Sequence, residues 1–353
     1  MPFYRDLNPK EKDADKRTVE RLLLLRKQLN EEIPKRTQKK TLLLATWNIR
    51  DFDADDYGKR LDEAIYYIAE IISCFDLVAI QEVNKDLTGL KRLMNILGGY
   101  WDVIFTDIPL GKRANQERMA FLYDKRKVKF GGLAGELVLP EKNKKGAMKF
   151  TQLARIPFIC GFTSGWTKFM LATVHIYYGT EKGAEPPERI EEIRQVAQKL
   201  KKRTKDEDAW ARNLILLGDF NIYRPENKTF QEIIKAGFKI PKKLQELPAN
   251  AKKDRHYDQI ALMTRKDSLD WTGKAGVFDY YKTVFCDTPE DKAIYMRYMT
   301  EYETTKEGKP RKESSKAIYY QTYWRTHQMS DHLLMWIELK IDYSDEYLRS
   351  KLK

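Results

Sequence analysis

A carboxylate and a carboxamide follow a short, fully apolar stretch of the chain. Residues 214–217 are Leu-Ile-Leu-Leu, Gly218 follows, and Asp219 and Asn221 come next. An unbroken apolar run of this length predicts a strand that is buried on both faces. On an extended backbone, residues i and i+2 point to the same side, so Asp219 and Asn221 could together hold a metal ion, a water molecule or a phosphate. Asp and Asn are also common turn residues, and an ordinary exit from a strand would use the same pair.

Side chains of the same chemical kinds recur at the ends of other predicted strands. Apolar runs predict strands at residues 41–46, 76–80, 101–106, 119–123, 168–174, 213–217, 256–263 and 332–340. The polar residues at or beside their ends are Asn48, Glu82, Glu117, His175, Asp258, Asp331 and His332. Because these strands must share a core, the sequence predicts one cleft at a sheet edge, lined by carboxylates, amides and two imidazoles. Taken one by one, the histidines could instead be core residues, and the glutamates could be surface carboxylates paired with Arg or Lys.

Three stretches have the apolar spacing of helices, namely residues 8–34, 61–73 and 188–203. For the first we expect Asn8 as the cap, Pro9 in the first turn and Glu11 at the capping-box position. We divide the chain into a charged N-terminal helix at residues 1–40 and one core domain at residues 41–345. The helix either packs on the core or binds a partner. A stretch rich in lysine and glycine, residues 125–149, predicts a hairpin and a loop.

The charge of the chain suits a polyanionic partner. Its 353 residues carry a net charge of +13, which favours nucleic acid, a phosphorylated ligand or an anionic membrane surface, although many basic proteins bind none of these. The three cysteines are far apart, which argues against a disulfide framework and for a reducing compartment. The first residues lack a secretory signal pattern, and no apolar run approaches the length of a membrane span. We therefore expect a cytoplasmic protein with no membrane partner and, by default, a monomer.

Taken together, the strand-end motifs resemble those of the endonuclease/exonuclease/phosphatase superfamily. This superfamily includes deoxyribonuclease I, repair nucleases of the exonuclease III type, inositol polyphosphate phosphatases and sphingomyelinases. The matching segments lie in the family's order between residues 41 and 340, and they are Thr46-Trp47-Asn48-Ile49-Arg50, Ile80-Gln81-Glu82-Val83, Glu117-Arg118, Thr173-Val174-His175, Leu217-Gly218-Asp219-Phe220-Asn221, Tyr257-Asp258-Gln259-Ile260 and Ser330-Asp331-His332. The resemblance implies an α+β fold, a four-layer α/β/β/α sandwich of two packed β-sheets flanked by helices. It also implies a metal-dependent phosphoesterase cleft at one end of the sandwich.

Within the superfamily, the chain is most similar to the deoxyribonuclease I branch. His175 stands where repair nucleases of the exonuclease III type commonly have tyrosine, and the segments Asn-Ile-Arg and Glu-Arg also match that branch. Inositol phosphatases usually carry Trp-Cys-Asp-Arg where this chain has His256-Tyr257-Asp258-Gln259. The resemblance therefore implies a DNA endonuclease. The alternative is a phosphatase or phosphodiesterase that acts on a small molecule or a lipid headgroup with the same scaffold.

The resemblance also implies a metal ligand set and a general base. Glu82 is the expected principal ligand of Mg²⁺, with Asn48 and Asp331 as helpers and with Mn²⁺ or Ca²⁺ as alternative ions. Hard divalent cations prefer oxygen ligands, usually one or two carboxylates with water and substrate phosphate. His332 is the expected general base, held in one tautomer by Asp258.

The remaining implied roles concern the substrate phosphate. His175, oriented by Glu117, is expected to contact or protonate phosphate oxygens. Asn221 is expected to donate to the oxyanion of the transition state, and Asp219 to bind metal or position the water. The phosphate-binding arginines are expected to be Arg50 and Arg155. The resemblance assigns the two histidines as a pair more firmly than it assigns which is base and which is acid.

Two positions depart from deoxyribonuclease I. The arginine that enters the minor groove, two residues after the metal glutamate, is replaced here by Asn84. A groove-contacting tyrosine, two residues before the second glutamate, is replaced by Asn115. The resemblance thus implies phosphodiester hydrolysis but leaves open whether duplex DNA is the substrate.

Residues 287–329 are longer than the family pattern requires, and we treat them as an insertion. It contains both cations and aromatic residues, namely Lys306, Lys309, Arg311, Lys312, Tyr319, Tyr320, Tyr323 and Trp324. Such a mixture could stack bases and follow a phosphate backbone. Equally, the aromatic residues could simply pack on the sandwich.

Overall fold

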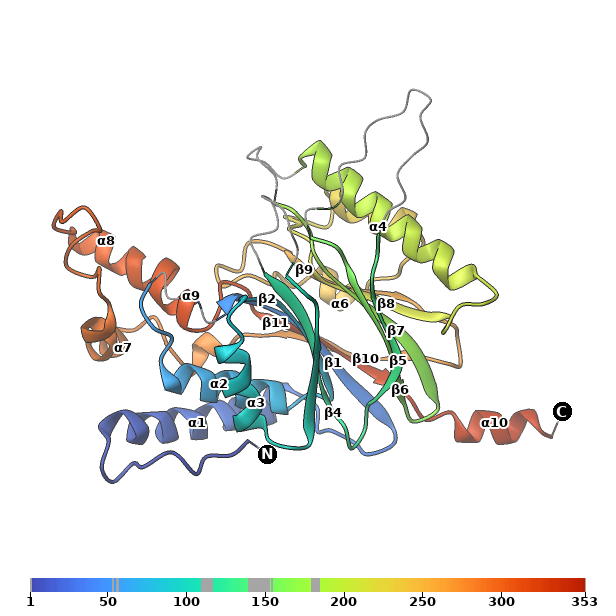
Figure 1. Ribbon diagram of the computed structural model, residues 1–353, viewed down its shortest axis with the longest axis horizontal. Coiled ribbons are helices and arrows are strands. Elements are labelled where there is room, and N and C mark those ends of the chain that lie inside the picture. The colour runs from blue at the N-terminus through green and yellow to red at the C-terminus, as the bar shows by residue number, and fades with distance from the viewer. Residues whose placement is uncertain are drawn as a thin grey trace.

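Two β-sheets form the centre of the molecule (Figure 1). The computed structural model describes residues 2–52, 54, 57–108, 117–138, 153, 155–178 and 185–352. Across the first sheet, the described strands follow the order β10 (Asp270–Phe278), β11 (Leu334–Lys340), β1 (Thr41–Phe52), β2 (Leu77–Val83), β4 (Arg118–Asp124) and β3 (Trp101–Phe105). Across the second, the order is β5 (Lys129–Glu136), β6 (Phe158–Ser164), β7 (Thr167–His175), β8 (Asn213–Asp219) and β9 (Asp258–Met263). The pairs β1–β2 and β7–β8 are parallel, and the other neighbours are antiparallel.

Helices cover the outer side of each sheet (Figure 1). Over the first sheet lie α1 (Asp13–Glu32), α2 (Asp62–Ser73) and α3 (Thr88–Leu97). Over the second lie α4 (Pro187–Lys205) and α5 (Lys228–Lys235). Two further helices are α6 (Lys242–Gln245) and α10 (Ser344–Ser350), and a 3-10 turn, η1, spans Tyr280–Lys282. The predicted four-layer α+β sandwich is thereby confirmed.

Alternation along the strands explains why both faces of the first sheet are covered. On β1, Leu42 and Leu44 pack in the cluster that fills the space between the sheets. Leu43 and Ala45 point the other way and pack with the helices α1 and α2. Successive side chains of a strand alternate between its faces, so an unbroken apolar run requires a partner layer on each side. The run at residues 214–217 is buried for the same reason.

Helix α1 is part of the core rather than a free appendage. Leu22, Leu25, Leu29 and Ile33 are buried in the cluster that includes α2. The expected capping by Asn8 and Pro9 is wrong, because the helix begins at residue 13 and no side chain caps it. The dividing line between residues 40 and 41 stays a prediction.

The hairpin expected within residues 125–149 can be checked only in part, because residues 139–149 lie outside the described residues. β5 lies in that stretch, but it pairs with β6 in the second sheet, whereas the preceding strand, β4, belongs to the first sheet. The chain therefore crosses from one sheet to the other between residues 124 and 129. Most of the remaining predicted loop lies outside the described residues.

The insertion at residues 287–329 consists largely of short helical pieces. These are α7 (Pro289–Tyr295), η2 (Met296–Tyr298), α8 (Glu313–Ile318), the π-helical η3 (Tyr319–Trp324) and α9 (Arg325–Gln328). Tyr319, Tyr320 and Trp324 are fully buried in the α1–α2 side of the core, whereas Tyr323 is 42% exposed. The suggestion that this row of aromatic residues stacks bases is thus wrong for the three buried ones. A search of the described residues for a helix with the length and apolarity of a membrane span found none.

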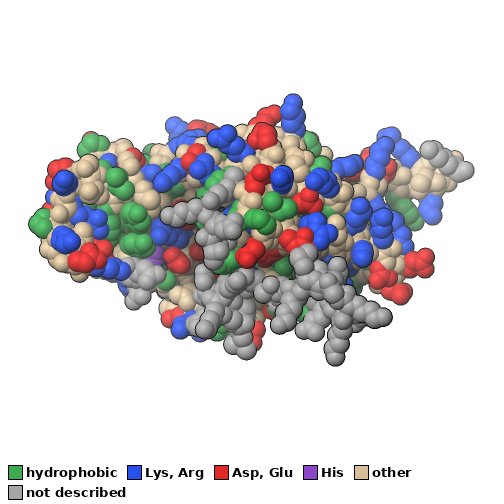
Figure 2. All heavy atoms as spheres, turned by 90° about the horizontal axis from the view of Figure 1, so that it is seen from above, with side chains coloured by type: hydrophobic (Ala, Val, Ile, Leu, Met, Phe, Trp, Pro, Cys, Tyr) green, Lys and Arg blue, Asp and Glu red, His purple; other side chains and the backbone are tan. Residues whose placement is uncertain are grey.

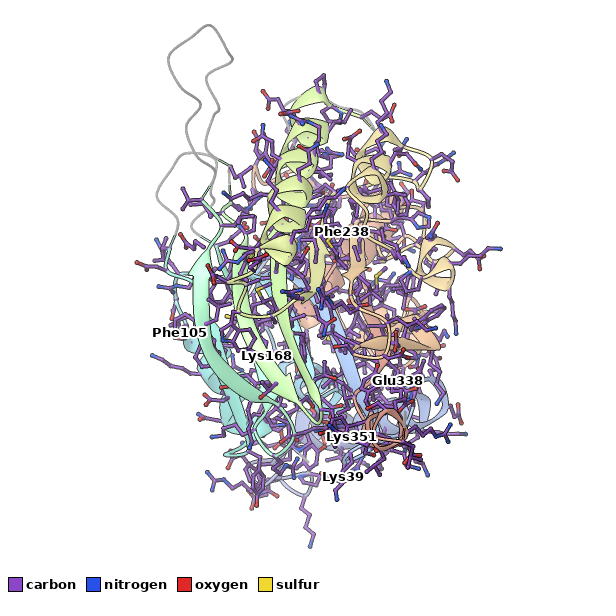
Figure 3. All side chains as sticks on the ribbon, turned by 90° about the vertical axis from the view of Figure 1, so that its right-hand side faces the viewer. Lys39, Phe105, Lys168, Phe238, Glu338 and Lys351 are labelled. Carbon is purple, nitrogen blue, oxygen red and sulfur yellow. The ribbon has the colours of Figure 1, made fainter. Side chains whose placement is uncertain are left out.

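The two ends of the sandwich differ. Lys39, just before β1, and Lys351, just after α10, both lie at the lower end in Figure 3. β1 and its parallel neighbour β2 therefore finish at the upper end, where the predicted polar residues stand.

Candidate active site

Strand direction gathers the predicted residues at one end of the sandwich. Asn48, Glu82, His175 and Asp219 stand at or near the carboxyl ends of the parallel pairs β1–β2 and β7–β8. Four further predicted residues stand at or just before the start of strands that run the opposite way. They are Glu117 before β4, Asp258 at the start of β9, and Asp331 and His332 before β11. The end of one antiparallel strand lies beside the start of the next, so all of these residues reach the same edge. In the second sheet, His175 is paired with Asp219, and Asp219 with Asp258.

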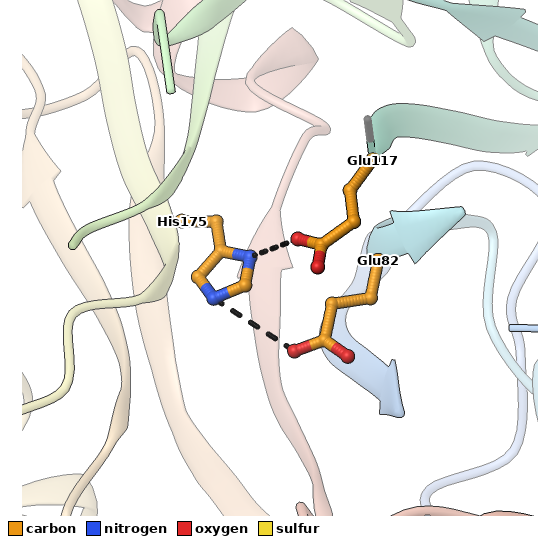
Figure 4. Close-up of side chains that lie close together, drawn as sticks. All are labelled: Glu82, Glu117 and His175. Atoms are coloured by element: carbon orange, nitrogen blue, oxygen red, sulfur yellow. Dashed lines mark ion pairs between the residues drawn. The ribbon is translucent and has the colours of Figure 1, made fainter. Parts of the chain in front are cut away.

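His175 is surrounded by three carboxylates. Its Nδ1 lies 3.3 Å from Glu117 Oε2, and its Nε2 lies 3.8 Å from Glu82 Oε1 (Figure 4) and 3.5 Å from Asp219 Oδ2. Possible ligand atoms of Glu82, Glu117 and His175 lie within 4.8 Å of one another. This spacing is short enough for one metal ion to contact all three. The cluster differs from the expected ligand set of Glu82, Asn48 and Asp331.

Asn48 joins the two sheets at the site. Its Nδ2 donates to Glu82 Oε1 at 2.7 Å and to Asp219 Oδ2 at 3.0 Å. Its Oδ1 is buried and has no hydrogen-bond partner among the described residues. A buried carbonyl oxygen without a partner is costly, and a bound cation is one way to satisfy it. The donor set of carboxylate and carboxamide oxygens fits a hard divalent cation such as Mg²⁺.

Glu82 is held in a strained conformation. Its φ is +61°, a region that side-chain-bearing residues rarely adopt, and the ladder to the neighbouring strands is irregular there. The backbone N–H of Asp51 donates to Glu82 Oε2 at 2.8 Å and fixes the carboxylate. Next to it, Gln81 donates to Thr173 Oγ1 at 2.9 Å and so links β2 of the first sheet to β7 of the second. Sequence reasoning missed this link, although Gln81 stands inside the Ile80–Val83 motif.

The electrostatics of the cluster follow from burial and excess negative charge. Burial raises the pKa of Glu82 to about 7, and the carboxylates of Glu117 and Asp331 add to the shift. Burial and Arg155 would lower the pKa of His175, but the surrounding carboxylates outweigh both and raise it. A divalent cation would relieve this crowding of like charges, which agrees with a metal site.

His332 and Asp258 form a buried pair. His332 Nδ1 lies 2.7 Å from Asp258 Oδ2, and its Nε2 lies 3.7 Å from Asp219 Oδ2. Burial alone would lower the pKa of His332, but the Asp258 and Asp219 carboxylates raise it well above its usual value. The geometry is that of an imidazole oriented by a carboxylate, with its other nitrogen directed into the site. Asp331 is exposed, and in the described part no hydrogen bond or ion pair joins its carboxylate to Glu82 or Asn48.

The two predicted phosphate-binding arginines are placed differently. Arg155 is buried, and its Nε lies 3.1 Å from Glu117 Oε2, beside His175. Arg50 turns toward the insertion, where it donates to the Thr322 carbonyl at 3.2 Å and to Thr326 Oγ1 at 2.6 Å. Its phosphate-binding role stays a prediction.

Asn221 reaches the site for a reason other than the one expected. The strand β8 ends at Asp219, and Asn221 has φ +53°, so the two side chains do not project from one extended backbone. A turn brings them together, because the Asn221 N–H donates to Asp219 Oδ1 at 2.8 Å and Asn221 Nδ2 donates to the Ile176 carbonyl at 2.7 Å. Gly218 is required just before, since a Cβ there would lie 2.1 Å from the Val174 carbonyl oxygen.

Sequence reasoning also missed Arg189 on α4. This side chain is 1% exposed, and its Nη1 donates to the Asn221 carbonyl at 2.6 Å. Nothing in the spacing of a charged helix marks one arginine as buried, so no sequence signal was available. Seen from above (Figure 2), the site end carries acidic side chains and a histidine among lysines and arginines.

Searches of the sequence against protein-family models and against curated proteins found no match. Solved structures match over most of the chain. A Bacteroides vulgatus protein described as an endonuclease/exonuclease/phosphatase is 17% identical, with 86% of this chain and 100% of that chain covered and a TM-score of 0.53. The Bacteroides thetaiotaomicron mannosyl-6-phosphatase is 17% identical, with 84% and 99% covered and a TM-score of 0.52. D. rerio TDP2 complexed with single strand DNA product is 17% identical, with 85% and 98% covered and a TM-score of 0.50. The chain therefore has the fold of the endonuclease/exonuclease/phosphatase proteins, as the motifs predicted.

Proposed function

We propose that this chain is a divalent-metal-dependent phosphodiesterase, and that its substrate is a nucleic acid, with DNA cleaved endonucleolytically as the first expectation. The observation that carries the proposal is the juxtaposition of two buried histidine–carboxylate groups around Asp219. Asp219 lies 3.5 Å from His175 Nε2 and 3.7 Å from His332 Nε2. Phosphodiester hydrolysis needs one group to take a proton from water and another to stabilise charge on the phosphate, and this arrangement offers both.

Glu82 and Asn48 would hold the metal ion. Asn48 Oδ1, which has no hydrogen-bond partner in the described part of the chain, and the raised pKa of Glu82 both favour a cation beside them, with Glu117 close enough to contribute. A bound Mg²⁺ would supply positive charge next to a phosphate oxygen and to the leaving oxygen. The expected contribution of Asp331 fits less directly, because its side chain is exposed.

His332 would act as the general base once a bound cation offsets the carboxylate charge that raises its pKa. A carboxylate 2.7 Å from Nδ1 fixes the tautomer and stabilises the imidazolium that forms when Nε2 accepts a proton. His175, held by Glu117, would donate to a phosphate oxygen. Asn221 Nδ2 has one hydrogen on the Ile176 carbonyl and a second left to donate to the developing oxyanion.

The test is cleavage of supercoiled plasmid and of a single-stranded oligonucleotide with Mg²⁺ or Mn²⁺, with and without EDTA. We expect metal-dependent cleavage, and His332→Ala should reduce kcat by about 10²- to 10⁴-fold. His256→Ala is the matched control and should leave cleavage unchanged, because within the described residues no hydrogen bond or ion pair joins His256 to a site carboxylate.

Cleavage that survives EDTA, or a His332→Ala protein as active as the wild type, would contradict the proposal. A wild-type protein that cleaves no nucleic acid but hydrolyses a soluble phosphoester would favour the alternative of a small-molecule or lipid-headgroup phosphatase. One solved structure of the same fold, the mannosyl-6-phosphatase, is described as such an enzyme.

A further inference from the structure

A row of three tyrosine rings leads outward from His332. The ring centroids of His332 and Tyr257 are 5.4 Å apart, those of Tyr257 and Tyr223 are 5.9 Å apart, and those of Tyr223 and Tyr178 are 6.4 Å apart. The hydroxyl groups of Tyr178 and Tyr223 are hydrogen-bonded to each other. Exposure rises along the row, from the buried His332 through the half-buried Tyr257 and Tyr223 to Tyr178, which is 42% exposed. The row thus connects the reacting centre with the surface.

Two arginines flank the row. The Arg255 guanidinium lies over the Tyr223 ring, 4.6 Å from its centroid, and its side chain is 31% exposed. The buried Arg189 lies 4.9 Å from the centroid of Tyr178 and donates to the carbonyl oxygens of both Tyr178 and Asn221. One guanidinium therefore ties the outer end of the row to a residue of the active site. This connection fixes the outer end of the row relative to Asn221.

Tyrosine rings in a row, tilted or edge-on to one another, beside a partly exposed guanidinium match the chemistry of one ligand class. Aromatic rings stack on nucleobases, and arginine pairs with phosphate or stacks on a base. Bases in a duplex already stack on one another, so only an unpaired base can use such a surface. We propose that Tyr178, Tyr223, Tyr257 and Arg255, which we call the tyrosine shelf, bind an unpaired base of the nucleic-acid substrate next to the scissile phosphate. The proposal rests on the function proposed above and narrows its substrate to single-stranded or locally opened nucleic acid.

A sugar phosphate is the competing ligand, because sugar rings also pack on aromatic side chains. Two observations favour nucleic acid. The row extends over three rings, more than a single sugar would cover, and Arg255, which also pairs with Asp254 at 3.3 Å, adds a cation that a ligand with one phosphate would not need. A polymer with a phosphate on every residue would use both.

The experiment removes a base from the substrate, the Tyr178 ring from the protein, or both, and compares the effects. The substrate is a short single strand with one cleavable phosphodiester. It is compared with a strand that lacks the base on the nucleotide before this bond, and then with a strand that lacks the base on the nucleotide after it. The measured quantity is the ratio of kcat/KM for the two strands. For one side of the cleavable bond, the wild-type kcat/KM should be about tenfold or more higher for the base-bearing strand, which is the effect expected for one stacked base. Tyr178→Leu should reduce this ratio toward one, whereas Tyr178→Phe, which keeps the ring, should preserve it.

Tyr100→Leu is the matched control. Tyr100 is also an exposed tyrosine beside an arginine, with Arg126 4.4 Å from its ring centroid, but it precedes β3 at the other end of the sandwich. A wild-type ratio near one on both sides, or an unchanged ratio in Tyr178→Leu, would overturn the shelf while leaving the phosphodiesterase in place. If neither strand is cleaved and a sugar phosphate is hydrolysed, the proposed function itself is overturned.

Discussion

Asp219 shows how one side chain at the end of a strand organises several others. Its carboxylate accepts from Asn48 Nδ2 and from the Asn221 N–H, and it lies within 3.7 Å of Nε2 of both site histidines. These four partners come from both sheets and from the turn after β8. Because Asp219 is 2% exposed, its charge acts at low dielectric and raises the pKa of each histidine. This one carboxylate therefore helps to raise the pKa of both histidines, after Glu117 for His175 and after Asp258 for His332.

The unpartnered oxygen of Asn48 leads to a prediction about metal binding. Asn48→Ala should weaken Mg²⁺ affinity at least about tenfold, because it removes an oxygen ligand together with the amide that orients Glu82. Isothermal titration with Mg²⁺ measures this affinity. Asn213→Ala is the control, since Asn213 is a buried asparagine at the other end of β8 whose amide is satisfied by Ser268 and by the Arg265 N–H. An Asn48→Ala protein that binds Mg²⁺ as tightly as the wild type would remove Asn48 from the ligand set.

His327, in α9, predicts a pH dependence of stability. Burial, with help from Arg60 and Arg50, lowers its pKa from 6.5 to about 3. Between these values the unfolded chain binds the proton and the folded chain does not, so the stability contributed by neutral His327 is lost as the pH falls below 6.5. The loss should approach about 1.4 kcal/mol per pH unit, or about 2 kcal/mol between pH 7 and pH 5.

The measurement compares the urea unfolding free energy of the wild type with that of His327→Gln at pH 7 and pH 5. The unfolding free energies of the two proteins must be subtracted, because the titration of Glu82 and Glu192 between pH 7 and pH 5 changes stability in the opposite direction. Burial raises the pKa of each to about 7, so they add stability as the pH falls. Parallel pH curves for the two proteins would show that His327 is not the titrating group.

At the scale of elements, the sequence predicted β1–β4, β7–β9 and β11 and missed β5, β6 and β10. β6 is central and largely buried, so burial on two faces did not by itself make a strand predictable. β1, β2, β7 and β8 are central strands whose apolar runs are unbroken, so their ends, and the site residues on them, could be placed. β5 and β10 are edge strands with mostly exposed residues, and their sequences show no apolar run.

Two further features, one in the site and one in the insertion, also lay beyond the sequence. The turn that carries Asn221 depends on a φ of +53°, which no periodicity reveals. The aromatic residues of the insertion have the same spacing whether they face the core or the solvent, and the structure places Tyr319, Tyr320 and Trp324 in the core. Burial in each case depends on tertiary contacts that are distant in sequence.

Helix α1 contains four consecutive leucines whose environments differ. Leu25 is fully buried, whereas its neighbour Leu24 is 50% exposed. Leu25→Ala should therefore lower the free energy of unfolding by about 2–5 kcal/mol, and Leu24→Ala should change it by less than about 1 kcal/mol. Urea unfolding of the two variants tests whether the helix belongs to the cooperative core. Equal and small effects would mean that α1 unfolds independently of the sandwich.

At the scale of the whole molecule, the site is acidic whereas the chain as a whole is basic. The site concentrates carboxylates that attract a divalent cation, while the chain as a whole carries +13. Figure 2 shows lysine and arginine side chains spread over the face that contains the site. A polyanion would thus be attracted by the surface as a whole, although the cluster itself repels it until a cation binds.

This distribution of charge predicts how substrate binding depends on salt. In the inactive His332→Ala background, the affinity for a single-stranded oligonucleotide should fall steeply with salt, with a slope of about 0.7 in log–log units for each phosphate neutralised. Arg255→Gln should reduce that slope by about 0.7, the contribution of one phosphate, because Arg255 of the proposed tyrosine shelf would pair with one phosphate. Arg349→Gln, on the exposed α10 near the opposite end, should leave it unchanged. Fluorescence anisotropy between about 50 and 200 mM salt measures the slopes. Binding that does not respond to salt would contradict a phosphate-reading surface, and equal slopes in all three proteins would exclude Arg255 from it.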